Sequence, residues 1–296
     1  MRIVNIFRII LCFFSVGLLS ACGGGSKTTS TAATAATSTR TQVTGTADSV
    51  NVTLSSGNVS GFSAINIANT ASFDFTENNS DGLVSKFSLS NASGTATFDK
   101  ASGHTINQVS RNGITILAAQ STSADALLVA MPNSGFGVYM SASDASNGFG
   151  ASSYVGRSGV SAINPSGTAT YRGGVIGLYG VTGFSPVYTV GDMTASANFN
   201  TNTISFSTSG TQGINPATGA YLGDYSALDI SATNLVDSNG NNIFISNSIS
   251  DSSGLSGSAE IALFGSSGQE LAGIGSLDNN SSNPTKVHLI SFGGDK

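Results

Sequence analysis

Histidine is the side chain most often used for proton transfer near neutral pH and for binding metal ions, and this sequence contains two, His104 and His288. Neither has a cysteine, a carboxylate or another histidine at a spacing typical of a metal site or a Ser-His-Asp triad. Asp237–Asn241 resembles part of a calcium loop, but Gly240 is misplaced and position twelve would be Ser248 instead of a bidentate Glu. We expect a hairpin turn there, and we expect no catalytic site, metal or cofactor.

A different chemistry is indicated at the N-terminus, where Cys22 follows Leu19-Ser20-Ala21 at the end of an apolar stretch. Arg2 and Arg8 provide a basic start, and Ile9–Leu19 is too short to span a bilayer comfortably. Residues 1–21 are therefore predicted to be a secretory signal, and its end resembles the lipobox of bacterial lipoproteins. The resemblance implies that cleavage leaves Cys22 as the first residue, with diacylglycerol on its thiol and palmitate among its acyl chains.

Such lipidation implies stable membrane attachment, because several acyl chains bind a bilayer far more strongly than one. Gly23, where an Asp would signal retention, implies sorting to the outer membrane in the lipoprotein scheme. Residues 22–46 are rich in Ser, Thr, Ala and Gly and contain almost no bulky apolar side chain, which predicts a flexible tether. Because Cys12 lies within the signal, we expect no disulfide in the mature chain.

The composition argues against a nucleic-acid-binding protein and indicates an all-β class. Removal of the signal leaves nine basic and 16 acidic residues, a net charge of −7, with no basic patch for nucleic acid. Only 9% of all residues are charged and 37 are glycine, and short apolar runs alternate with turn residues, as in all-β proteins. A mature length of about 275 residues exceeds the usual size of a single core, so two domains are expected.

The first expected domain, residues 47–133, is a series of short alternating runs separated by turn residues. Asn-Gly pairs such as Asn112-Gly113 and the Ser55–Asn58 segment favour tight hairpin turns. Thr122–Met131 has modest helical character before Pro132, but we favour a strand. These features predict an antiparallel β domain.

The second expected domain, residues 134–296, has longer strands and more aromatic residues. Ser166–Gly180 and Asp192–Phe199 are predicted strands, and Leu255–Leu277 is predicted to be a hairpin that closes a barrel. Gly173-Gly174 is not a phosphate loop, since no helix follows; glycine there relieves crowding in a curved wall. Eight to ten strands result, and an up-and-down barrel would remove exposed edges.

Four pieces of the second domain, taken in order, resemble the β-barrel domain of the transferrin-binding protein B family: Gly167–Gly173, Met193–Phe199, Leu255–Glu260 leading to Phe264-Gly265, and Glu270–Gly273 with the terminal Phe292–Gly294. The resemblance covers about Gly135 to the C-terminus. It implies an all-β, lipid-anchored surface protein with an N-terminal handle-like β domain and a C-terminal eight-stranded up-and-down β-barrel. It does not imply transferrin binding, because the family's full receptor has two such lobes and this chain has no Trp.

The expected function is that of a non-enzymatic binding module at the outer membrane. The partner would be a host protein or a small ligand, and the resemblance implies a surface lipoprotein assembly modulator as the translocator. Two alternatives stay open: a structural or self-associating surface lipoprotein that scavenges no ligand, and a membrane-spanning, porin-like barrel.

Two predicted barrel connections, Gly180–Val187 and Thr211–Ser226, are long for hairpins. They carry Phe184, Tyr221 and Tyr225, and exposed aromatic side chains recur in binding hot spots. These three residues are the candidate ligand-binding residues. In the alternative interpretation, their rings fold back and plug the mouth of the barrel.

Overall fold

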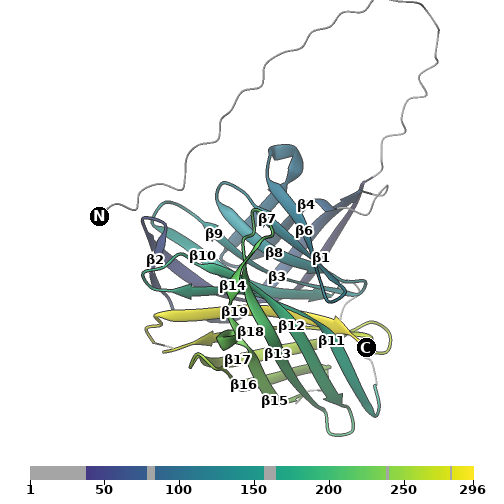
Figure 1. Cartoon of the computed structure of the whole chain (residues 1–296). Coiled ribbons are helices and arrows are strands. Elements are labelled where there is room, and N and C mark those ends of the chain that lie inside the picture. Colours follow the sequence, from purple (N-terminus) through teal and green to yellow (C-terminus); the bar gives the residue numbers. More distant parts are fainter. Residues whose placement is uncertain (1–37, 79–83, 157–164, 238–239, 281) are drawn as a thin grey trace, which may run out of the picture. The chain divides into compact units, whose positions relative to one another are not determined.

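Antiparallel strands account for nearly all regular structure in the computed structural model of the chain (Figure 1). The structure describes residues 38–78, 84–156, 165–237, 240–280 and 282–296. The predicted signal and Cys22 lie outside these residues. Short polar turns separate the strands, and two three-residue 3-10 turns, η1 (Lys100–Ser102) and η2 (Ser226–Leu228), lie among them. No helix of the described residues is long and apolar enough to cross a membrane.

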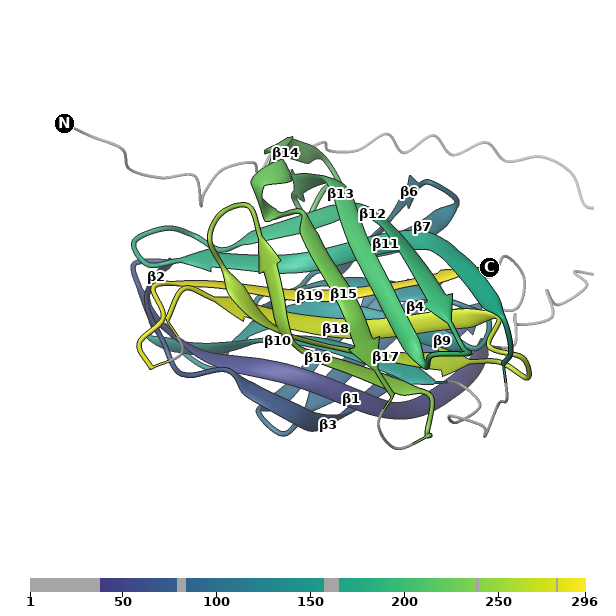
Figure 2. The ribbon, with the colours of Figure 1, turned by 90° about the horizontal axis from the view of Figure 1, so that it is seen from below.

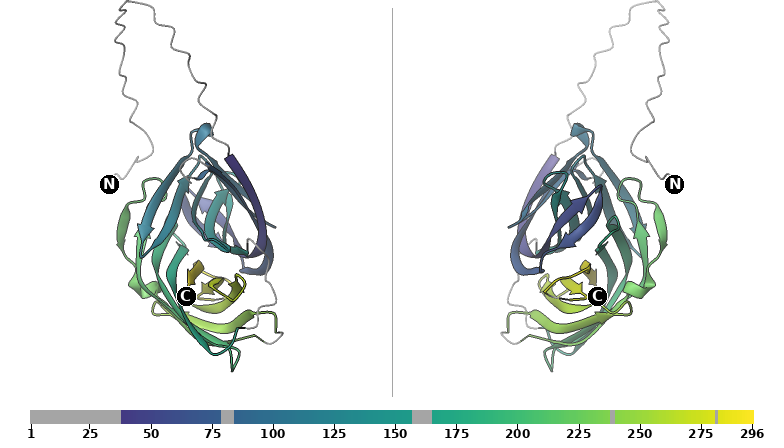
Figure 3. Two further views of the ribbon diagram at one scale, coloured as in Figure 1. Left: turned by 90° about the vertical axis from the view of Figure 1, so that its right-hand side faces the viewer. Right: turned by 90° about the vertical axis from the view of Figure 1, so that its left-hand side faces the viewer.

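The first sheet contains ten strands and occupies the purple-to-teal part of the chain in Figure 1. They are β1 (Ser38–Ser55), β2 (Asn58–Phe62), β3 (Asn66–Asn78), β4 (Val84–Asn91), β5 (Gly94–Asp99), β6 (Thr105–Arg111), β7 (Ile114–Gln120), β8 (Ala124–Ala130), β9 (Ser134–Ala142) and β10 (Asn147–Gly156). Their order is β5-β4-β3-β1-β10-β9-β8-β7-β6, and β2 pairs with β1. The sheet curls around its own core, as Figure 3 shows.

The second sheet is a closed barrel. Its strands are β11 (Thr168–Val181), β12 (Val187–Asn198), β13 (Thr203–Ile214), β15 (Ile230–Val236), β16 (Ile243–Asp251), β17 (Ser256–Phe264), β18 (Glu270–Asp278) and β19 (Lys286–Asp295), with the short β14 (Tyr221–Asp224) attached to β13. Each strand pairs with its neighbour along the chain, and β19 returns to β11. The predicted all-β class and the C-terminal eight-stranded up-and-down barrel are confirmed.

Two boundaries differ from the sequence prediction. Strands β9 and β10 were expected in the barrel, but they pair within the first sheet, so the chain changes sheet between Gly156 and Thr168. Some of the glycines after Pro132 allow close packing between the sheets, as Gly150 does against Leu178 and Gly156 against Phe264, and such packing is independent of strand pairing. The predicted tether is also too long, because residues 38–46 extend β1 and pair with β3. Val43 is buried there, which gives this stretch an apolar anchor.

Alternation along the strands divides the side chains among separate cores. In β17, Ala259 and Ile261 point into the barrel, whereas Ala262 and Phe264 belong to a cluster shared with the first sheet. The outer wall of β17 and β18 is therefore covered instead of solvated, which explains why the alternation in this hairpin weakens toward Phe264. A fourth cluster joins β1 and β2 to β19 through residues such as Val50 and Leu289.

The tight turns have the backbone geometry and hydrogen bonds that the sequence predicts. Asn112 and Gly113 both have positive φ, as do Ser56 and Gly57, so both hairpins use the turn that matches the twist of the strands. The described amides of Gly240, Asn241 and Asn242 donate to the carboxylate of Asp237, as expected of a turn. The stretch Thr122–Met131, for which a strand was favoured over a helix, contains β8.

Gly273 in β18 provides a test of packing in the barrel wall. A Cβ on Gly273 would lie 2.4 Å from the carbonyl oxygen of Glu260 and 2.8 Å from the ring of Phe292. We expect Gly273→Val to lower the free energy of unfolding by about 1 to 3 kcal/mol, because the backbone neighbour cannot move aside. Urea denaturation measures the change. Ser258→Val on the neighbouring strand, whose side chain faces away from the barrel interior, is the control, and an unchanged midpoint for the glycine variant would contradict this account.

Candidate functional site

The exposed apolar side chains of the barrel's longest connection make up the strongest candidate site. Strand β13 continues past its pairing with β15, and its last residues pair with β14. A register shift leaves Leu222 without a direct partner in the ladder. Tyr221 and Leu222 expose 48% and 59% of their surface, which is unusual for adjacent large apolar residues. Figure 2 shows β14 at the margin of the barrel. We call residues 215–228 the β14 excursion.

The β14 excursion is held by the first sheet. The side-chain amide of Asn107, on β6, donates to the carbonyl oxygen of Ala217 at 2.6 Å. A Cβ on Gly219 would lie 2.7 Å from a methyl group of Val109, so β6 and the excursion are in close contact. The excursion also closes on itself, because the amide of Asn215 donates to the carbonyl of Ala220. Its apolar residues are thus presented on a fixed backbone.

Arg111, at the end of β6, joins the two sheets beside this excursion. Its Nε donates to Asp192 Oδ1 of β12 at 2.8 Å, Nη1 donates to Gln212 at 3.0 Å, and Nη2 donates to the carbonyl of Gly210 at 2.7 Å. Burial alone would lower the pKa of Arg111, but the hydrogen bond with Asp192, aided by Tyr221, outweighs burial and raises it. The guanidinium therefore stays charged and fixes both β13 and Tyr221.

Phe184 lies on a different connection. The loop between β11 and β12 spans residues 182–186 and is bound to β2: Gly183 donates to the carbonyl of Val59, and Val59 donates to the carbonyl of Phe184. Strand β2 pairs with β1, whereas β6 is the last strand of the first sheet, so these two connections contact separate parts of that sheet. Phe184 is thus held by β2 on the first connection, whereas Tyr221 and Tyr225 lie on the second.

The predicted length of the first of these connections was wrong, whereas that of the second was nearly right. Five residues separate β11 from β12, an ordinary hairpin loop, because β11 and β12 extend further than the apolar pattern indicates. The longer connection contains β14 and η2. Phe184 is 67% exposed and Tyr221 is half exposed, so neither ring plugs the barrel. The half-buried ring of Tyr225 lies over Gly213, where a Cβ would be 2.8 Å from the ring. The ligand-binding role of the three residues stays a prediction.

The interior of the barrel contains polar groups at the end where β19 begins. His288 is 2% exposed and faces the same side of β19 as Ile290 and Phe292, both of the barrel core. Its ring meets that of Tyr179 edge-on at 5.9 Å, and neither ring nitrogen has a hydrogen-bond partner. Burial lowers the pKa of His288 to about 3. The imidazole is therefore neutral at physiological pH, and it acts as a packed ring.

Among the described residues, no cluster of three or more His, Cys, Asp or Glu is placed to hold a metal ion. His104 accepts a hydrogen bond at Nδ1 from the backbone amide of Asp99, as part of a turn. Leu222 was not predicted as a site residue, although its neighbour Tyr221 was a candidate and could have drawn attention to it. It also missed Asn107 and Arg111, for which the sequence carries no signal, since Arg111 and Asp192 are 81 positions apart.

Comparison with protein-family models and with curated proteins finds no match to this chain. Among solved structures, it is similar to a double mutant of transferrin-binding protein B from Haemophilus parasuis Hp5, with 10% identity, coverage of 86% of this chain and 76% of that chain, and a TM-score of 0.38. It is similar to intact Ap-TbpB with its N and C lobes, with 8% identity, coverage of 87% and 77%, and a TM-score of 0.38. The isotype 1 transferrin-binding protein B of serogroup B Neisseria meningitidis gives 11% identity, coverage of 86% and 76%, and a TM-score of 0.36.

The structural matches thus include members of the family that the sequence resembles, and the expected resemblance is confirmed at that level. Identities of 8 to 11% with these TM-scores say nothing about a ligand.

Proposed function

We propose that this chain is a lipid-anchored lipoprotein of the outer membrane that presents the β14 excursion at the cell surface to bind a protein partner. The observation that carries the proposal is the exposure of Tyr221 and Leu222 on a segment whose backbone is held by Asn107 and whose supporting strand β13 is held by Arg111. Aromatic and aliphatic side chains on a rigid backbone lose little conformational entropy when a partner covers them. The anchor is supported by the sequence Leu19-Ser20-Ala21-Cys22.

The first test concerns the anchor. Cells that express the full chain are labelled with a palmitate analogue and fractionated. We expect the label and outer-membrane partitioning for the parent, and loss of both for Cys22→Ala. A Cys22→Ala variant that still partitions with membranes would overturn the lipoprotein assignment. Protease treatment of intact cells then separates the cell surface from the periplasmic leaflet, because a surface protein is degraded and a periplasmic one is protected.

The second test concerns the binding face. The chain from residue 23 onward is immobilised and exposed to host serum, and retained proteins are compared among variants. We expect Tyr221→Ser combined with Leu222→Ser to reduce capture at least about tenfold, the usual consequence of removing a hot spot. Ile67→Ser is the matched control, since Ile67 on β3 of the first sheet exposes 56% of its surface and is not a candidate binding residue. Equal capture by both variants, at unchanged melting temperature, would place the binding face elsewhere.

Self-association is a second candidate function, favoured by one observation. Val236 on β15 and Ile245 on β16 lie directly opposite each other and expose 46% and 45% of their surface. Light scattering of the same soluble chain distinguishes the two candidates. Concentration-dependent oligomers that disappear in Val236→Ser would favour self-association, whereas a monomer leaves the β14 excursion as the binding face.

A further inference from the structure

A cleft opens between the two sheets at the end where β11 begins and β19 ends. It measures about 380 Å³, which is within the usual range for sites that bind small molecules. The β6–β7 and β8–β9 turns of the first sheet form one side of the cleft, and the barrel wall forms the other. The residues that line it include Asn112, Ile114, Met131, Pro132, Arg172 and Asp295.

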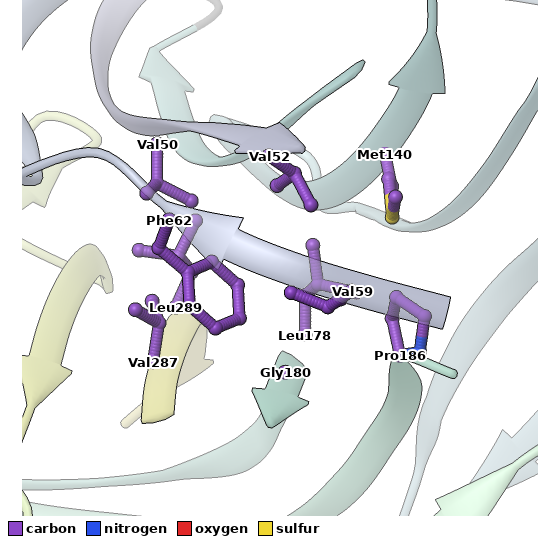
Figure 4. A pocket seen from close by; sticks show the side chains of 10 residues that line it. All are labelled: Val50, Val52, Val59, Phe62, Met140, Leu178, Gly180, Pro186, Val287 and Leu289. Atoms are coloured by element: carbon purple, nitrogen blue, oxygen red, sulfur yellow. The ribbon is translucent and has the colours of Figure 1, made fainter. Parts of the chain in front are cut away.

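The sheets meet differently at the other end of β11 and β19. Figure 4 shows that region, where Leu178, Val287 and Leu289 of the barrel lie among Val50 and Val59 of the first sheet. The space that remains there measures about 10 Å³, and all the residues that line it are apolar. Apolar packing therefore fills the interface at that end, whereas the opposite end is hollow and carries charged side chains.

Two oppositely charged side chains line the cleft from neighbouring strands of the barrel. Arg172 on β11 and Asp295 on β19 are directly opposite each other in the antiparallel ladder, and both are exposed. Arg172 lies on the same side of β11 as Gly174, which contacts Ile114 of the first sheet. Both charges are therefore on the outer side of the barrel, toward the first sheet.

The charges of Arg172 and Asp295 are not neutralised within the part of the chain that the structure describes, where neither residue forms an ion pair. Asp192, on the neighbouring strand β12, is bound by Arg111 at 2.8 Å. Glu270, which lies opposite Asp295 on β18, accepts hydrogen bonds from the β8–β9 turn and the start of β9. The cleft thus offers one cation and one anion to a ligand.

The first sheet gives the cleft an apolar wall on a fixed backbone. Ile114 packs on Gly174, where any side-chain carbon would collide with it, so the barrel holds Ile114 in place. The amide of Met131 donates to the carbonyl of Ser134 at 2.8 Å, which closes the β8–β9 turn beside Pro132. An apolar ligand group that covers this wall is removed from water without a change in the fold.

We propose that this cleft binds a free α-amino acid with an apolar side chain. Arg172 binds the carboxylate of the ligand, because a guanidinium can donate two parallel hydrogen bonds to it, and Asp295 binds the ammonium group. The Cβ atoms of directly opposite residues in a ladder are about 5 Å apart, so one small molecule can contact both side chains. A ligand with only one of the two charges is repelled by the residue of like charge.

This site is distinct from the β14 excursion and does not depend on the proposed function. None of the residues that line the cleft belongs to residues 215–228. Loss of protein capture in the Tyr221 and Leu222 variant thus leaves this inference intact, and failure of the cleft to bind an amino acid leaves the proposed function intact.

L-leucine is the probe, titrated at pH 7 into the chain from residue 23 onward by calorimetry and by methyl chemical shifts. We expect saturable one-site binding, with shifts at Ile114 and Met131. N-acetyl-L-leucine lacks the ammonium group, L-leucinamide lacks the carboxylate and glycine lacks the apolar side chain. We expect each to bind at least about tenfold more weakly. Binding of any of the three as tightly as L-leucine would overturn the assignment of ligand class.

Two variants test the charged residues separately. Arg172→Gln and Asp295→Asn are expected to bind L-leucine at least about tenfold more weakly with the melting temperature retained, because both side chains are exposed. Asp295→Asn is also expected to bind N-acetyl-L-leucine at least about threefold more tightly than the parent does, since it no longer repels the carboxylate. Lys286→Gln, at the opposite end of β19, is the matched control. No saturable binding of L-leucine, or equal affinity for it in the parent and both variants, would overturn the proposal.

Discussion

The free energy of unfolding is expected to fall by about 1.4 kcal/mol for each pH unit below about 6.5, because His288 is buried as a neutral imidazole. In the folded chain burial lowers its pKa to about 3, while the unfolded chain takes up a proton near the ordinary value of 6.5. Between these values the unfolded state binds more protons, so stability is lost as the pH falls. At pH 4.5 the loss amounts to about 3 kcal/mol.

His288→Leu isolates this effect, because leucine fills a similar space and cannot be protonated. Urea denaturation of both proteins at pH 7.5 and pH 4.5 gives the comparison, and the difference between them is independent of the carboxylates that both share. We expect the variant to lose about 3 kcal/mol less than the parent over this range. His104→Ala is the control, since His104 lies in a turn. Parallel pH profiles for the parent and His288→Leu would show that the imidazole is protonated in the folded barrel.

The second large effect is expected at Glu270, a carboxylate of the barrel that is 3% exposed and bound to the first sheet. It accepts hydrogen bonds from the amide of Asn133 at 3.1 Å, from Asn133 Nδ2 at 2.9 Å and from Ser134 Oγ at 2.8 Å. Glu270→Ala leaves these donors in a buried place without an acceptor, at a cost of about 3 kcal/mol. Urea denaturation at pH 7 measures the change.

Glu270→Gln is the matched variant for this prediction. The amide keeps one acceptor oxygen and the length of the side chain, but it turns an NH₂ group toward donors, so we expect a loss of about half that of the alanine variant. Glu260 offers a second comparison, because it pairs with the phenol of Tyr154 across the same two sheets and is more exposed. Equal stability of the parent and Glu270→Ala would mean that the turn at Asn133 is held by other contacts.

The fold was predictable wherever local residues determine it. Asn112-Gly113 requires positive φ at both positions, and alternation along Asp192–Phe199 assigns one face to the barrel interior. Sheet membership was not predictable in the same way. Strand β10 pairs with β1 and β9, and β9 also pairs with β8. These pairings use backbone groups that every residue carries, so the side chains do not identify the partner strand. The change in composition at Pro132 was therefore a poor guide to the boundary.

The candidate site was predictable in part. Tyr221 stood out as an aromatic residue in a segment rich in turn residues, and it is exposed. Its neighbour in space, Arg111, is 110 positions away and belongs to the other sheet, so no local pattern could connect them. Phe184 was grouped with Tyr221 because both lie in barrel connections, but the loop around Phe184 pairs with β2. His288 was described as a lone histidine of a terminal strand, and its position inside the barrel depends on closure by β19, which no local pattern shows.

In both sheets, pairing between strands that are distant in the sequence determines the order in which the chain can fold. Gly45 pairs with Val155, 110 positions later, and Arg172 pairs with Asp295, 123 positions later. Bringing such distant segments together costs loop-closure entropy before any stabilising contact has formed, and folding is slow for this reason. During synthesis, β1 cannot acquire β10 as a neighbour until most of the first sheet exists, and the barrel keeps two free edges until β19 has left the ribosome. The barrel therefore remains incompletely folded until β19 is present. Factors that bind unfolded polypeptides can bind the chain in that state.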